Sequence, residues 1–190
     1  ASDSFENIAR EQSGKILIAF DDLASIFYYG DFLKGYYFRS GKTISDALRE
    51  SYANAEAIFA ECQRFDEKLQ NDARRYGEEY LLLLYASLRQ SMAAHKIVED
   101  RKGRTLFLSK ECNSDGCIAT ADVSYPSAPL YLLYAPELVN GMLYPIFDFA
   151  RMDAWEYDFA PHDAGIYPYC LGQLYGALNQ NNKYNSEIYM

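Results

Sequence analysis

The feature that most constrains the fold is a pair of long amphipathic segments in the first half of the 190-residue sequence. The first begins at Thr43, whose spacing to Asp46 resembles a capping box, and its apolar residues recur at three- and four-residue steps as far as Leu69. The second runs over about residues 72–98 with the same periodicity. Because the connection between them is short, the pattern predicts two antiparallel helices, an αα-hairpin.

Shorter patterns predict the remaining elements. In chain order, these are a helix over 23–38, a strand over 105–109, an extended segment before Pro126, helices over 127–134 and 136–150, and a last helix over 169–178. Pro145 lies inside the helix over 136–150, and we expect Gly141, four residues earlier, to ease the resulting bend. The sequence therefore predicts a mainly α fold of antiparallel αα-hairpins with minor β structure.

Composition and charge narrow the classes of function. The formal net charge is −9 and no Lys/Arg-rich run is present, which argues against nucleic-acid binding. No apolar stretch is long enough to span a membrane, so no membrane partner is predicted. Cys112 and Cys117 form a single close pair without the second pair that a zinc site needs, and no nucleotide-binding motif occurs. We therefore predict no metal and no cofactor, while a disulfide and reduced thiols both stay open.

Two long loops, over 100–126 and 152–168, are expected on one rim of the packed hairpins. The first contains Asp122, which we predict to be a catalytic carboxylate, because hydrolysis needs a group that activates water and an acid for the leaving group. The alternative for Asp122 is a helix cap, a turn ligand or a salt bridge. Lys110, Glu111 and Tyr125 lie in the same loop.

The second loop contains His162 and Asp163, and we expect their side chains to diverge because the residues are adjacent. His162 is predicted to donate a hydrogen bond to a substrate carbonyl or carboxylate, or to titrate near neutral pH. The alternative is a structural histidine beside Pro161. Asp163 is expected to cap a helix or to orient a neighbouring loop. His95, predicted near a helix end, is interpreted as structural.

Several long segments resemble one known family. "QSMAAHKIV", "SKECNSDGCIATADVSYPSAPLYLLYAPELVNGMLYPIFDFA" and "FAPHDAGIYPYCLGQLYG" are similar to the six-hairpin domain of the glutaminase A family, and "IAFDDLASIFYYGDFLKGYYFRSGKT" fits its entry segment. The resemblance implies an (α/α)6 toroid, an architecture also used by several glycosidases. It also implies hydrolysis of glutamine to glutamate and ammonia, and, since members are usually exported, a secreted or periplasmic location.

The same resemblance implies that residues 1–190 are one domain that forms the first half of a larger toroid. A complete toroid needs roughly twelve helices, which exceeds this length. We therefore expect the remaining domains of a parent protein to be partners. We also expect the isolated chain to be inactive if a second catalytic acid lies beyond Met190. Uncovered helix faces would favour self-association.

Three hypotheses for function follow. In the first, part of a glutaminase-like hydrolase, Asp122 and His162 are catalytic. The predicted substrate-binding residues for the small-molecule substrate are Lys110, Glu111, Tyr125, Asp163 and Tyr167. In the second, a glycoside hydrolase, Asp122 is a general base and aromatic residues stack on sugar rings, namely Tyr125, Trp155, Tyr157 and Tyr167. In the third, the chain is a non-catalytic helical module.

Overall fold

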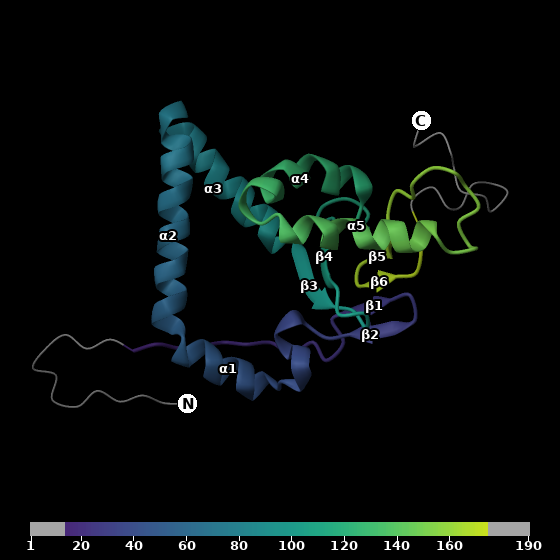
Figure 1. Cartoon of the computed structure of the whole chain (residues 1–190), viewed down its shortest axis with the longest axis horizontal. Coiled ribbons are helices and arrows are strands. Elements are labelled where there is room, and N and C mark those ends of the chain that lie inside the picture. The colour runs from purple at the N-terminus through teal and green to yellow at the C-terminus, as the bar shows by residue number, and fades with distance from the viewer. Residues whose placement is uncertain (1–13, 175–190) are drawn as a thin grey trace, which may run out of the picture.

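The computed structural model describes residues 14–174, and Figure 1 shows how their helices and strands are arranged. In chain order the elements are β1 (Ile26–Tyr28), β2 (Asp31–Leu33), the 3-10 helix η1 (Tyr36–Gly41), α1 (Ile44–Ala53), α2 (Ala55–Ala73), η2 (Arg74–Tyr76), α3 (Glu78–Ala93), β3 (His95–Glu99), β4 (Thr105–Ser109), α4 (Ala121–Tyr134), α5 (Glu137–Ala150), β5 (Gly165–Ile166) and β6 (Tyr169–Cys170). The predicted mainly α fold with minor β structure is confirmed.

The predicted helical hairpin is present as α2 and α3. The capping box at Thr43 and Asp46 is also observed, but the helix that it starts, α1, ends at Ala53, and Asn54 separates it from α2. The turn between α2 and α3 lies over Arg74–Tyr76, a few residues later than expected. The second helix was predicted to reach residue 98, which is wrong, because residues 95–99 leave the helix and pair with β4.

The helix predicted over residues 23–38 is also wrong. This segment forms the antiparallel pair β1–β2 and then η1. The turn between the strands needs positive φ at two successive residues, 44° at Tyr29 and 103° at Gly30, which no α-helix contains. Phe27 and Phe32, whose spacing suggested a helix, instead face each other across the β1–β2 pair, with ring centroids 4.8 Å apart.

The segment before Pro126 was predicted to be extended, and this is wrong as well, because it forms the first turns of α4. Pro126 and Pro129 both lie inside the helix and remove the hydrogen bonds to the carbonyls of Asp122 and Tyr125. Both of those residues are exposed, so water can solvate the freed carbonyls. The Ser127 hydroxyl adds bonds to carbonyls in the same turns.

The centre of the fold is the contact between α5 and the β3–β4 hairpin. Pro136 occupies the N-cap position of α5, one residue before the helix begins, whereas the sequence predicted it in the first turn. A Cβ atom at Gly141 would lie 2.7 Å from the Thr105 carbonyl oxygen and 2.9 Å from the Phe107 nitrogen, both in β4. The absent side chain therefore allows α5 to approach β4 closely. The sequence had suggested a different role for Gly141, the easing of a bend at Pro145. Around this contact lies a core that includes Val98, Leu106, Leu108 and Ile118.

Segments from both ends of the described chain share one sheet. Its strand order is β2–β1–β6–β5, and β6 runs parallel to β1. The helix predicted over 169–178 is wrong for all of its described residues, 169–174, since Tyr169–Cys170 form β6 and residues 171–174 are irregular, while residues 175–178 lie outside the described residues. The parallel pairing brings the C-terminal part of the fold beside its beginning.

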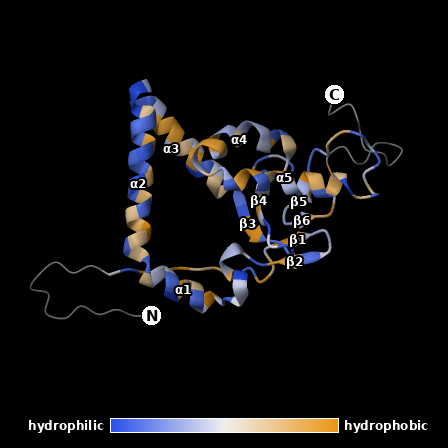
Figure 2. Cartoon of the chain, viewed as in Figure 1, coloured by the Kyte–Doolittle hydropathy of each residue, from blue (hydrophilic) through white to orange (hydrophobic). Residues whose placement is uncertain are grey.

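Large apolar side chains remain exposed on the helical hairpins. Figure 2 shows apolar residues along α3, while the upper part of α2 is hydrophilic. Leu82 and Leu83 are 65% and 63% exposed on α3, and Leu132 and Leu133 are similarly exposed on α4. Self-association through such faces stays a prediction. Across residues 14–174, no helix is both long enough and apolar enough to cross a membrane.

The replacement Gly141→Ala tests the helix–strand contact. We expect a lower free energy of unfolding, because overpacking against backbone costs roughly 1–3 kcal/mol, while alanine in a helix regains only about 1 kcal/mol. Urea titration followed by circular dichroism measures this. Asn140→Ala, at an exposed position of the same helix, is the control and should leave stability within about 0.5 kcal/mol. Equal stability of both variants would contradict the close contact.

Candidate functional site

The two loops that were predicted to share a rim are hydrogen-bonded to each other. Four backbone bonds join residues 116–121 to residues 162–167. They run from Ala164 N–H to Ile118 O (2.9 Å), Ile118 N–H to Gly165 O (2.9 Å), Tyr167 N–H to Gly116 O (3.0 Å) and Ala121 N–H to His162 O (2.6 Å). The last bond places the first residue of α4 against the second loop, so the two sets of candidate residues meet.

Asp122 and His162 lie together at this junction. The Nε2 atom of His162 is 3.5 Å from the Oδ1 atom of Asp122. The Asp122 side chain is 72% exposed, whereas that of His162 is 9% exposed. Asp122 is in the first turn of α4, where the helix dipole also stabilises a carboxylate. The pair therefore combines a held imidazole with a solvent-accessible carboxylate.

Asp163 is fully buried and holds the imidazole from its other side. Its Oδ2 atom is 3.0 Å from His162 Nδ1, so the expectation that the two side chains diverge is wrong. Its Oδ1 atom accepts hydrogen bonds from the N–H groups of Gly165 and Leu174, each at 2.9 Å. The bond to Gly165, two residues on, closes a local turn that directs the carboxylate back to the histidine. Asp163 thus orients a loop, one of its two predicted roles.

The surroundings of His162 favour its protonated form. Burial lowers the pKa of the imidazole, but the hydrogen bond to Asp163 and the charges of Asp122, Asp163 and Glu111 outweigh this, and the net pKa lies above the ordinary 6.5. The raised pKa favours a cationic imidazole close to an exposed carboxylate. This arrangement can donate a proton or a charged hydrogen bond at Nε2 while Asp122 accepts one.

Three of the predicted substrate-binding residues lie beside this pair. Glu111 accepts a hydrogen bond from Thr120, the residue before α4, at 2.6 Å. Lys110 lies over the ring of Tyr167, with Nζ 4.9 Å from its centroid. Lys110 and Glu111 also line an open cavity of about 720 Å³ that reaches Val123. Neither Asp122 nor His162 lines that cavity, which approaches the pair at Val123, the residue after Asp122.

The aromatic candidates differ in their accessibility. Tyr125 is 84% exposed, one helical turn beyond Asp122. Trp155 is 5% exposed and packs against Phe149 and Tyr157, with its N–H bonded to the Phe159 carbonyl. The buried Trp155 cannot stack on a sugar ring, which removes one part of the glycoside hydrolase hypothesis.

Sequence reasoning missed two residues of the site. Gln173 accepts a hydrogen bond from the His162 backbone N–H at 2.8 Å, and its amide is buried. Thr120 is buried and donates to Glu111. No local pattern signals Gln173, because its contact spans eleven residues of irregular chain. Thr120 has a weak signal, since a threonine before a helix is a frequent cap.

His95 has the structural role that the sequence suggested. It begins β3, directly after α3, and its ring stacks on Phe107 with centroids 4.0 Å apart. Its Nδ1 atom is 2.6 Å from the Ser91 carbonyl oxygen. Burial lowers the pKa of His95, in contrast to that of His162.

One group of side chains has the spacing of metal ligands. The ligand atoms of Glu111, Asp115 and Cys117 lie within 4.8 Å of one another. Burial, and then nearby carboxylates, raise the pKa of the Cys117 thiol well above its usual range, which disfavours the thiolate that zinc binds. The four cysteines, all inside the described range, are free thiols. The absence of a metal site stays a prediction.

Fold and site together define a class, a mainly α domain of helical hairpins whose loops carry a carboxylate–histidine cluster. Residues 77–184 match the family model of the glutaminase A six helical-hairpin domain. This match covers more than half of the chain, and the chain belongs to that family.

Two curated relatives agree with this assignment. Glutaminase A of Aspergillus oryzae (strain ATCC 42149 / RIB 40) is 28% identical over 142 residues, which are 74% of this chain and 20% of the relative. A protein named Probable glutaminase/05536, from Arthroderma benhamiae (strain ATCC MYA-4681 / CBS 112371), is 28% identical over 125 residues, 65% of this chain and 14% of the relative. The chain thus spans a fifth or less of their length. No solved structure matches it significantly.

Asp163→Asn tests the electrostatics of the site. The asparagine retains Oδ1 for its two backbone bonds but removes the charge beside Nδ1, so the pKa of His162 should fall. A histidine with a raised pKa stabilises the folded state below pH 6.5, and this stabilisation is lost as the pH rises through the pKa of the folded state. The free energy of unfolding of the variant should therefore change less over this pH range than that of the parent chain. NMR titration of His162 and urea titrations at several pH values measure both effects. Asp153→Asn, at an exposed position, is the control, and an unchanged His162 pKa in Asp163→Asn would contradict the assignment.

Proposed function

We propose that this chain contributes the Asp122–His162 pair to an enzyme that hydrolyses the side-chain amide of glutamine, giving glutamate and ammonia. The observation that carries the proposal is the line of three groups in which buried Asp163 binds Nδ1 of His162, and Nε2 lies 3.5 Å from Asp122. The family match and the names of the relatives support the same chemistry.

In this proposal Asp122 takes a proton from water as the water oxygen attacks the amide carbon. Protonated His162 donates a hydrogen bond to the developing oxyanion, or to the substrate carboxylate, and Asp163 acts as a positioning residue that holds the imidazole. A raised His162 pKa favours the donor form near neutral pH. The proton that Asp122 takes from water passes to the leaving nitrogen, so that ammonia departs and the Asp122 carboxylate is restored.

Substrate binding is proposed for the residues beside the pair. An amino-acid substrate carries a carboxylate and an ammonium group, which the adjacent charges of Lys110 and Glu111 match. Their cavity of about 720 Å³ has ample room for such a molecule. Tyr167 supports Lys110 through its ring, and Tyr125 offers an exposed hydroxyl one turn from Asp122. Acidic charge elsewhere on the chain makes these local contacts more important.

The two other hypotheses become outcomes of the test. Glycoside hydrolysis loses support because Trp155 is buried and Lys110 lies over one face of the Tyr167 ring. A non-catalytic module would need the Asp163–His162 contact only to hold the loop, whereas the exposed Asp122 carboxylate beside His162 supports a catalytic role.

The experiment uses the full-length parent protein, incubated separately with glutamine and with a panel of aryl glycosides. We expect ammonia release from glutamine, reduced about 10²–10⁴-fold in Asp122→Asn, the usual range for general acid–base groups. Asp153→Asn makes the same chemical change at an exposed position and should retain activity.

Sugar release without ammonia would replace this proposal with glycoside hydrolysis. Full ammonia release by Asp122→Asn would show that Asp122 is not the catalytic carboxylate. A parent protein that is folded but turns over neither substrate class would favour the non-catalytic module.

A further inference from the structure

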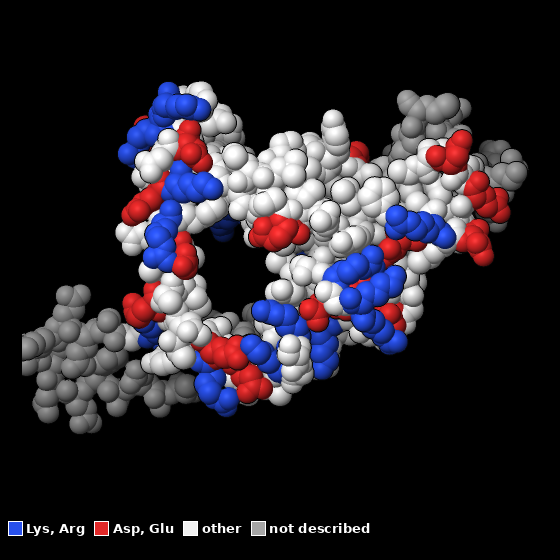
Figure 3. Space-filling view, viewed as in Figure 1, with Lys and Arg blue, Asp and Glu red and all other residues white. Residues whose placement is uncertain are grey.

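A second cavity, of about 440 Å³, lies at the opposite end of α5 from its Pro136 cap. Its walls come from the β1–β2 turn, the turn over residues 100–104 and the C-terminal end of α5. Figure 3 shows a group of Lys and Arg side chains gathered over this region. None of the predicted catalytic and substrate-binding residues lines this cavity, namely Lys110, Glu111, Asp122, Tyr125, His162, Asp163 and Tyr167. It is therefore a separate feature of the surface.

The floor of this cavity is an ion-pair network whose carboxylates are already satisfied. The guanidinium of Arg104 binds both oxygens of Asp148 and, through Nε at 2.7 Å, Asp100. Asp148 also accepts a bond from the Tyr28 hydroxyl at 2.7 Å, and Asp100 accepts two backbone N–H bonds. The same Arg104 lies over the ring of Tyr144, 4.4 Å from its centroid. These contacts give the cavity a rigid base in which one guanidinium is shared by two carboxylates, so that any anion must be attracted by the cations of the rim.

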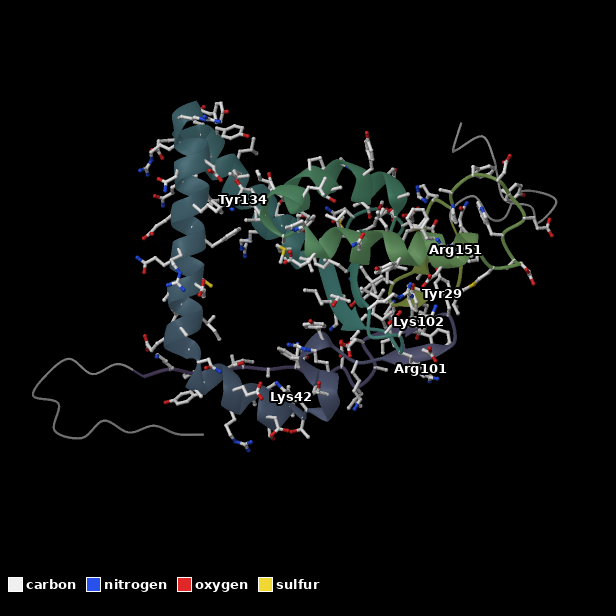
Figure 4. The ribbon with its side chains drawn as sticks, in the orientation of Figure 1. Tyr29, Lys42, Arg101, Lys102, Tyr134 and Arg151 are labelled. Carbon is white, nitrogen blue, oxygen red and sulfur yellow. The ribbon has the colours of Figure 1, made fainter. Side chains whose placement is uncertain are left out.

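The rim carries three further cations. Arg101 is paired with Asp31 at 2.8 Å. Within residues 14–174, Lys102 and Arg151 are exposed and lie within 4.0 Å of no carboxylate oxygen, although the charge of Lys102 acts on Asp148 and Arg151 lies 5.8 Å from the centroid of the Phe147 ring. Figure 4 shows Arg101, Lys102 and Tyr29 close together, with Arg151 beside them at the end of α5. The cavity thus has four cations against three carboxylates, on a chain whose net charge is −9.

We propose that this cavity binds a small, multiply charged oxyanion, held by Lys102 and Arg151 and flanked by Arg101. The cavity volume fits a small-molecule site, and a concave surface concentrates the field of the cations. The hydroxyls of Tyr28 and Tyr29 already donate to Asp148 and to the Pro145 carbonyl, so the cations provide the recognition and the rings provide the walls. A guanidinium beside an ammonium suits phosphate and dicarboxylate groups alike.

The test titrates the ¹⁵N-labelled chain with inorganic phosphate and, separately, with succinate at constant ionic strength. We expect saturable shifts of the backbone amides of residues 100–104 and 148–152 with at least one probe, and the tighter probe identifies the ligand chemistry. In Lys102→Ala/Arg151→Ala the affinity should fall about tenfold or more, because both charge-assisted contacts are lost.

Lys68→Ala/Arg89→Ala is the matched control, since it removes two exposed cations from α2 and α3. It should bind as the parent chain does, and circular dichroism checks that both double variants are folded. Shifts spread over the whole surface, no saturation with either probe, or equal weakening in both variants would overturn the proposal. The outcome is independent of the glutamine assay, because no residue is shared.

Discussion

The pairing of residues 116–121 with residues 162–167 is the constraint on which the candidate site depends. Asp122 is on a helix and His162 is in an irregular loop, forty residues apart, and neither element alone brings them into contact. A hydrogen bond of 2.6 Å from the Ala121 N–H to the His162 carbonyl oxygen holds the start of α4 against the loop. Parallel pairing of β6 with β1 then holds the far side of the same loop. Backbone hydrogen bonds therefore bring the two segments together, and this places the side chains of Asp122 and His162 in contact.

Asp163 illustrates how a charged group can be buried at such a junction. A carboxylate without partners would be costly in the interior, but Asp163 accepts bonds from two backbone N–H groups and faces the His162 imidazole. One oxygen stabilises the loop and the other positions the ring. The same residue thus couples the stability of the loop to the orientation of His162. The exposed Asp122 remains the group that can reach a substrate.

Sequence reasoning found the elements whose information is local. The β4 strand, the αα-hairpin and the start of α5 at Pro136 follow from periodicity and capping, and the shared rim followed from connectivity. It failed where tertiary contacts override local preference. The prolines in α4 suggested an extended segment, and the aromatic residues over 23–38 suggested a helix, although positive φ at Tyr29 and Gly30 requires a turn. The contact between adjacent His162 and Asp163 depends on a turn that no spacing rule encodes.

The candidate site depends on buried Asp163 setting the tautomer of His162, so that Nε2 faces Asp122. Long-range ¹H–¹⁵N NMR of the imidazole above its pKa measures the tautomer directly. The structure predicts that the neutral ring carries its proton on Nδ1, donated to Asp163, and leaves Nε2 unprotonated. A neutral ring protonated on Nε2 would contradict this arrangement, because Nδ1 could then not donate to the buried carboxylate.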